Sequence, residues 1–166
     1  MQHLDRSASR SMTKKFRRGW PGMFSERVGN LMERNDLLTA SPEMTVSEAS
    51  RLMARRKVGA VMVTRDGKLV GIFTERDVVF RVIAQGLDVE ATRLADVMTS
   101  SPITIDPNKS FGLALVLMQK NGFRHMPVTE NGVPVGMVSA RNALDPDLEE
   151  FALESYRREK ILREMN

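Results

Sequence analysis

The chain of 166 residues contains no cysteine and only two histidines, His3 and His125. Without cysteine it can form no disulfide, no thiolate nucleophile and no Cys-ligated zinc site. Two histidines also argue against a His-based metal cluster or a Ser-His-Asp triad. We therefore expect neither catalytic nor metal-binding residues, and no required cofactor.

Long apolar segments are absent as well. No run of apolar residues approaches the roughly 20 that cross a bilayer, and the N-terminus lacks the short apolar core of a secretory signal. We therefore expect no membrane contact and a cytoplasmic location. The alternative is an organelle transit peptide, because the first 20 residues are rich in Arg and Ser and poor in acids.

Positive charge is concentrated at one end of the chain. Residues 1–27 hold seven basic and two acidic side chains, whereas the remaining chain holds 18 basic and 19 acidic ones. The body is therefore close to neutral and is not a basic platform for nucleic acid. We expect residues 1–27 to form a flexible, solvated leader. The alternative is a basic arm that contacts nucleic acid or an acidic partner.

The sequence from Thr39 to Val79 repeats itself, without a gap, 65 residues later as Thr104 to Leu144. Such a repeat predicts one supersecondary unit built twice, in which each copy covers an apolar face of the other and clefts form between them. Identical pairs include Thr39/Thr104, Pro42/Pro107, Ala49/Ala114, Met53/Met118, Val63/Val128, Thr64/Thr129, Gly67/Gly132, Val70/Val135, Gly71/Gly136 and Arg76/Arg141.

Each copy follows the order β-α-β-β-α, so we expect an α+β fold of two repeats related by pseudo-twofold symmetry. Apolar residues spaced by three and four predict the first helix, and an Asp-Gly or Asn-Gly pair predicts a tight hairpin. The expected strands are 37–40, 60–64 and 69–73 in the first copy and 103–105, 126–129 and 133–138 in the second. We divide the chain into the leader 1–27, repeats 28–92 and 93–147, and a C-terminal helix 148–166.

A motif at the start of the second helix is the candidate for ligand chemistry. It runs from Gly71 to Asp77 and returns from Gly136 to Asn142. One interpretation is a helix cap, in which the hydroxyl of Thr74 or Ser139 satisfies backbone N–H groups. The other is a ligand site: glycine permits close approach to the backbone, the helix start offers free N–H groups to phosphate, arginine adds charged hydrogen bonds and Asp accepts from ribose hydroxyls.

With this motif in both copies, the sequence resembles a tandem pair of CBS domains, also called a Bateman module. The resemblance runs from about Val28 to Leu144. It implies a flat body whose central cleft holds up to two adenosine-containing ligands (AMP, ADP, ATP, S-adenosylmethionine or NAD), usually in a disc-like homodimer. The candidate ligand-binding residues are Thr39, Gly59, Ala60, Val61, Gly71, Thr74, Arg76, Asp77, Thr104, Arg124, His125, Met126, Pro127, Ser139, Arg141 and Asn142.

In that family the hydroxyl at Thr74 and Ser139 contacts ribose or phosphate, Asp77 holds the ribose hydroxyls, and Thr39 and Thr104 match positions that line the adenine. The two copies differ, because Asn142 stands where the first copy has Asp77. We therefore expect the site that uses Asn142 to bind ribose less well or to stay empty.

The second copy also has Arg124 and His125 where the first has Gly59 and Ala60. These two side chains are candidates for phosphate contact. The alternative for His125 is a histidine hydrogen-bonded within the fold.

The sequence favours a non-catalytic module that senses an adenosine ligand and signals to a protein partner of unknown identity or through its dimer. A nucleic-acid-associated protein that uses the basic leader is the alternative. An enzyme would require an acid-base group such as Glu75 beside Arg76 and Asp77, but charges on a solvated helix are the simpler interpretation.

Overall fold

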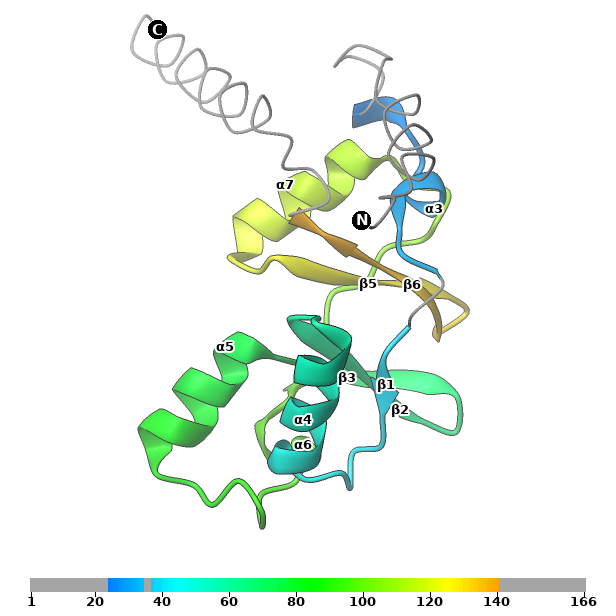
Figure 1. Cartoon of the computed structure of the whole chain (residues 1–166). Helices are drawn as coiled ribbons and strands as arrows, with labels where there is room; N and C mark the ends of the chain where they lie inside the picture. Colours follow the sequence, from blue (N-terminus) through cyan, green and yellow to red (C-terminus); the bar gives the residue numbers. More distant parts are fainter. Residues whose placement is uncertain (1–23, 35–36, 141–166) are drawn as a thin grey trace, which may run out of the picture.

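Two similar units, each built of helices and strands, lie one above the other in the computed structural model, which describes residues 24–34 and 37–140 (Figure 1). The expected leader up to residue 23 and the expected C-terminal helix lie outside these ranges. Within them, no helix has both the length and the apolar composition of a membrane-spanning segment.

The first unit contains β1 (Thr39–Ala40), α4 (Val46–Arg56), β2 (Ala60–Arg65) and β3 (Lys68–Thr74). Strand β1 pairs in parallel with β2, β2 pairs antiparallel with β3, and β3 pairs antiparallel with β4 (Thr99–Ser100). The segment after β3 is helical throughout: α5 (Glu75–Asp77), the π-helical η1 (Val78–Val82) and the 3₁₀ turn η2 (Ile83–Gln85).

Local sequence accounts for the bounds of α4. Thr45 and Glu48 form a reciprocal capping box at its start, and Lys57 adopts a left-handed conformation at its end. The predicted apolar stripe of Val46, Ala49 and Met53 is buried against the sheet.

The second unit contains α7 (Phe111–Asn121), β5 (His125–Glu130) and β6 (Val133–Ser139). Its expected first strand, 103–105, is reduced to one residue: Ile105 pairs in parallel with Val128 through a single bridge. Pro102 directly precedes this segment and has no amide donor for a ladder. Both predicted hairpins are present, with Asp66–Gly67 and Asn131–Gly132 at positive φ.

Each hydrophobic core is completed by the short helix that precedes the other repeat in the chain. Helix α3 (Val28–Leu31) contributes Val28 to the core around Phe111, and Figure 1 shows it in blue beside the second unit. Helix α6 (Leu94–Val97) contributes Leu94 and Val97 to the core of the first unit. Neither repeat can therefore complete its core without a segment from outside its own β-α-β-β plan.

Equivalent backbone hydrogen bonds in the two units show their pseudo-twofold relation. The amide of Glu75 donates to the carbonyl of Gly59 at 3.0 Å, and the amide of Ala140 donates to the carbonyl of Arg124 at 2.9 Å. The two donors lie 65 positions apart in the sequence, and so do the two acceptors. The α+β class and the two repeats of one plan are confirmed.

Candidate functional site between the repeats

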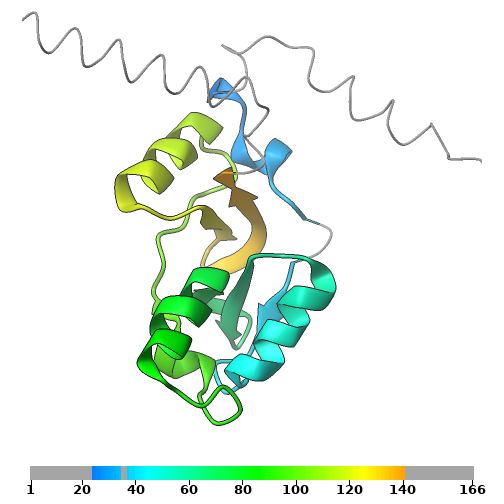
Figure 2. The same cartoon turned by 60° about the vertical axis from the view of Figure 1, so that its left-hand side comes forward.

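A cavity of about 610 Å³, the larger of two that His125 borders, lies between the two units. Figure 2 shows the helical segment after Glu75 and α7 on the same side of the molecule, with α4 on the opposite side of the first unit. A volume of this size suits a small-molecule ligand. The lining residues are Ile72, Thr74, Glu75, Arg76, Asp77, Phe80 and Arg81 from the first unit, and Thr99, Ser101, Pro102, Ile103, Asn121, Gly122, Phe123, Arg124 and His125 from the rest.

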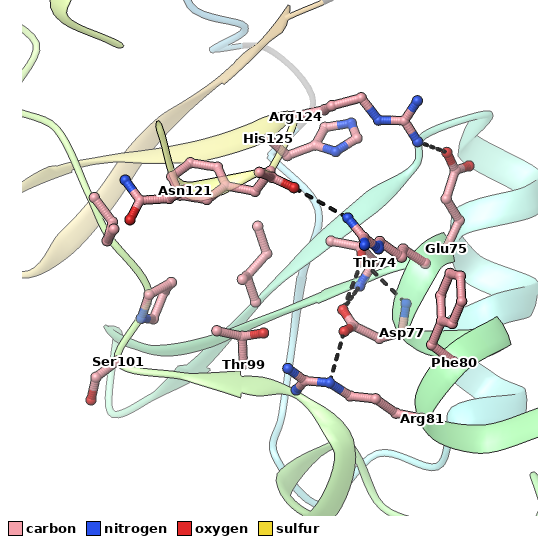
Figure 3. Close-up of a pocket in the computed structure, with 16 residues that line it drawn as sticks. Thr74, Glu75, Asp77, Phe80, Arg81, Thr99, Ser101, Asn121, Arg124 and His125 are labelled. Carbon is pink, nitrogen blue, oxygen red and sulfur yellow. Dashed lines mark hydrogen bonds and ion pairs between the residues drawn. The ribbon is translucent and has the colours of Figure 1, made fainter. Parts of the chain in front are cut away.

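Thr74 and Asp77 form a capping box at one wall of this cavity (Figure 3). The Asp77 carboxylate oxygen Oδ2 accepts from the Thr74 amide at 2.8 Å and from the Thr74 hydroxyl at 2.7 Å. Its other oxygen, Oδ1, lies 3.2 Å from Nε of Arg81. Because each carboxylate oxygen can accept two hydrogen bonds, Oδ1 keeps acceptor capacity for a ligand hydroxyl.

Arginine side chains from both units line the cavity, and each makes a hydrogen bond or an ion pair. Arg76 donates to the carbonyl of Gly122 at 3.2 Å and lies 5.4 Å from the centre of the Phe80 ring. Arg81 donates to the carbonyls of Val97 and Met98, at 3.1 and 2.9 Å.

The third arginine, Arg124, lies 3.8 Å from the carboxylate of Glu75, and both side chains are more than half exposed. The contacts of Arg76 and Arg124 both join the two units across the cavity.

A second, smaller cavity of about 140 Å³ is lined by residues of both units. It is the repeat-related counterpart of the larger one, because most of its lining residues lie 65 positions from a residue that lines the larger cavity. These pairs are Leu37/Pro102, Leu38/Ile103, Lys57/Gly122, Val58/Phe123, Gly59/Arg124, Ala60/His125, Ile72/Met137 and Thr74/Ser139. His125 borders both cavities.

The structure brings together part of the set proposed from sequence. The larger cavity gathers Thr74, Arg76, Asp77, Arg124 and His125. The smaller one gathers Gly59, Ala60, His125 and Ser139. Arg141 and Asn142 lie outside the described residues.

The other proposed residues line neither cavity. Thr39 and Thr104 are exposed. Val61, Met126 and Pro127 are buried within their strands.

Two parts of the ligand interpretation need correction. The first concerns the glycine that both copies share: a Cβ at Gly71 would overlap the sulfur of Met98, and one at Gly136 would overlap the sulfur of Met32. Close packing of methionine, not close approach of a ligand, therefore requires glycine at both positions.

The second correction concerns the helix start. The amide of Glu75 donates to the carbonyl of Gly59 at 3.0 Å, and the amide of Asp77 donates to the Thr74 hydroxyl at 3.4 Å. These N–H groups are not free for phosphate, and the capping interpretation is confirmed at Thr74. The arginine side chains that line this cavity are those of Arg76, Arg81 and Arg124.

Sequence reasoning missed several lining residues. Arg81 carried a signal, because it follows Asp77 by four positions on a helix, where opposite charges meet. Adding 65 to the neighbours of Gly59 would have found Gly122 and Phe123. No pattern marked Thr99 or Ser101.

Comparison with known proteins places these observations in a wider group. A family model described as CBS domain matches residues 28–84 and 94–147. The CBS domain-containing protein CBSCBSPB2 of Arabidopsis thaliana is 38% identical over 120 residues, which are 72% of this chain and 22% of that protein. The chain thus spans about a fifth of the length of this plant relative.

Two further proteins are similar over most of their own length. The CBS domain-containing protein YhcV of Bacillus subtilis is 37% identical over 101 residues, which are 61% of this chain and 71% of that protein. A solved structure of a putative signal-transduction protein with CBS domains from Burkholderia ambifaria has a TM-score of 0.67 and 28% identity. It covers 70% of this chain and 90% of its own.

Proposed function

The chain belongs to the CBS domain family, and we propose that it is a non-catalytic sensor that binds one adenosine-containing ligand in the larger cavity. AMP, ADP and ATP are the first candidates, followed by S-adenosylmethionine and NAD. One observation carries this proposal: Thr74, Arg76 and Asp77 of one repeat face Arg124 and His125 of the other around a single cavity.

The lining chemistry matches the three parts of such a ligand. Ile72, Ile103 and Phe123 offer apolar surface to a purine base, and Ile103 is 42% exposed. Asp77 Oδ1 can accept from a ribose hydroxyl. Arg76 and Arg124 offer charge-assisted hydrogen bonds to a phosphate group.

Signalling follows from the contacts that cross the cavity. A phosphate that binds Arg76 competes with the carbonyl of Gly122, and one that binds Arg124 competes with Glu75. Occupancy therefore replaces contacts that join the two repeats, which gives the ligand different affinities for two arrangements of the pair. A coupling free energy of about 1–3 kcal/mol is typical of such linkage.

The molecule that responds to this change in arrangement is a regulated protein partner or a second copy of the chain. Large apolar side chains are exposed on η1, η2 and α7. Val79, Ile83 and Val116 are 53%, 60% and 59% exposed, respectively. Burial of such side chains favours association, so we propose a homodimer, which sedimentation equilibrium would detect.

Thermal unfolding of the full chain with each candidate ligand tests the binding proposal. A ligand at 100 times its dissociation constant stabilises the folded state by about 2.7 kcal/mol, which corresponds to a rise in Tm of roughly 5–10 °C. Arg51→Gln, which removes a charge outside the cavity, should keep the same shift. The absence of a shift with every adenosine compound would overturn the proposal.

A further inference from the structure

Glu75 places a carboxylate in the lining of the larger cavity, beside Gly59, which lines the smaller one. It is the first residue of α5, and its amide is held by the carbonyl of Gly59. Its side chain lies over that glycine, because a Cβ at Gly59 would stand 3.2 Å from both Cδ and Oε2 of Glu75. Figure 3 shows the carboxylate directed toward the Arg124 guanidinium.

The charges around the larger cavity fall into two groups. Asp77 and Arg81 form one ion pair, with Oδ1 and Nε 3.2 Å apart, and so largely compensate each other. The second group consists of Arg76, Arg124 and Glu75, in which Glu75 compensates Arg124 at 3.8 Å. Arg76 donates to a neutral group, the carbonyl of Gly122, which does not compensate its positive charge.

The pseudo-twofold relation shows that this carboxylate is a feature of one cavity alone. The positions 65 residues from Glu75 and Arg124 hold Ala140 and Gly59. The backbone hydrogen bonds are the same in both places, because the amide of Ala140 donates to the carbonyl of Arg124. The fold therefore does not need a carboxylate at this position, and Glu75 changes the charge of the larger cavity without changing its frame.

We propose that Glu75 sets the number of phosphate groups that the larger cavity accepts, and that it favours adenosine ligands with at most one phosphate. This inference rests on the proposed function of the same cavity. Because the nearby Glu75 carboxylate partly compensates Arg124, Arg76 is the stronger of the two cations that a phosphate can meet. Every further phosphate brings negative charge toward the Glu75 carboxylate.

The test compares the full chain with Glu75→Gln, and uses calorimetry to measure the affinities for adenosine, AMP, ADP and ATP. Coulomb's law at about 6 Å, with an effective dielectric constant between about 40 and 80, gives roughly three- to tenfold per charge. We expect Glu75→Gln to raise the ratio of ATP to AMP affinity by about tenfold. The affinity for adenosine should stay unchanged, which also shows that the variant is folded.

Glu90→Gln is the matched control, because Glu90 is also an exposed glutamate paired with an arginine, Arg51 at 2.8 Å, and it does not line the cavity. It changes the net charge equally and should leave the ratio within about twofold, provided that the measurements use the same low salt. In a chain that also carries Arg124→Gln, the gain from Glu75→Gln should persist, because repulsion between the Glu75 carboxylate and the added phosphates does not require Arg124.

Two results would overturn the inference and leave the proposed function intact. One is an equal change in affinity for all four ligands, which would mean that Glu75 acts only on the frame. The other is a native chain that prefers ATP and loses that preference in Glu75→Gln. If no adenosine compound binds the native chain or either variant, both proposals fail.

Discussion

The side chain of Met98 lies against Gly71 so closely that a methyl group on the glycine would overlap the methionine sulfur. Met32 and Gly136 repeat this relationship in the second unit. Each methionine directly follows one of the short helices that complete a core, so the contact fixes α6 or α3 against its sheet. Strand β3 continues from Gly71 to Thr74, and this packing therefore positions the wall of the larger cavity.

We expect Gly71→Ala to destabilise the fold by about 1–3 kcal/mol, the usual cost of overpacking a filled site. The direction of the change in stability is informative, because replacement of glycine by alanine at a compatible backbone position usually stabilises the fold by about 0.4–1 kcal/mol. Urea unfolding should show a lower midpoint with an unchanged slope. In a chain that also carries Met98→Ala, the cost of the alanine should be smaller. Additive effects of the two substitutions would contradict the contact.

The two ribose positions give a second prediction. Asp77→Ala should weaken binding of an adenosine ligand more than Asn142→Ala, because a carboxylate is the stronger acceptor for ribose hydroxyls. Calorimetry on both variants measures the difference. Asp77 also caps α5, so Asp77→Asn, which keeps a side-chain acceptor for the cap, separates loss of binding from loss of stability. The reverse order of affinities would assign the better ribose site to the second repeat.

Local patterns in the sequence predicted the fold well where the structure depends on neighbours in the chain. The stripe at Val46, Ala49 and Met53 defines α4, and Asp66–Gly67 defines the hairpin. The exchange of short helices could not be read in this way. Val28 reaches the core of the second repeat through tertiary packing. No periodicity in the sequence predicts which sheet a four-residue helix will cover.

The residues of the candidate site show the same difference between local patterns, which the sequence reveals, and tertiary contacts, which it does not. Thr74 and Asp77 were found because a hydroxyl and a carboxylate three positions apart mark a helix start. The facing wall at Thr99 and Ser101 comes from β4 and the residue after it, where the sequence has no motif. Its place beside Asp77 follows from the pairing of β4 with β3, with Gly71 opposite Ser100.

The capping box of α4 gives a prediction about pH. Hydrogen bonds from the Thr45 amide and hydroxyl lower the pKa of Glu48 from its ordinary value of 4.5. A lowered pKa in the folded state means that the carboxylate contributes stability above its unfolded pKa and that this contribution is lost as the pH falls through the folded pKa. Glu48→Gln should therefore lower the unfolding midpoint at pH 7 and have little effect at pH 3. Glu130→Gln, in the β5–β6 hairpin, is the control. A Glu48→Gln effect of equal size at both pH values would contradict this account.

Arg76 gives the last prediction, because its guanidinium crosses the cavity to Gly122 and is the cation that the proposed function assigns to a phosphate. We expect Arg76→Gln to lower the affinity for AMP about tenfold or more, since hydrogen bonds to charged groups contribute about 1.5–3 kcal/mol. The affinity for adenosine should change little, because adenosine carries no phosphate. Arg76→Lys keeps the charge but not the planar guanidinium, so its affinity for AMP should lie between those of the native chain and Arg76→Gln. Calorimetry with AMP and adenosine on these variants and on Arg51→Gln separates the outcomes: an equal loss for both ligands would mean that Arg76 holds the repeats together without touching the phosphate.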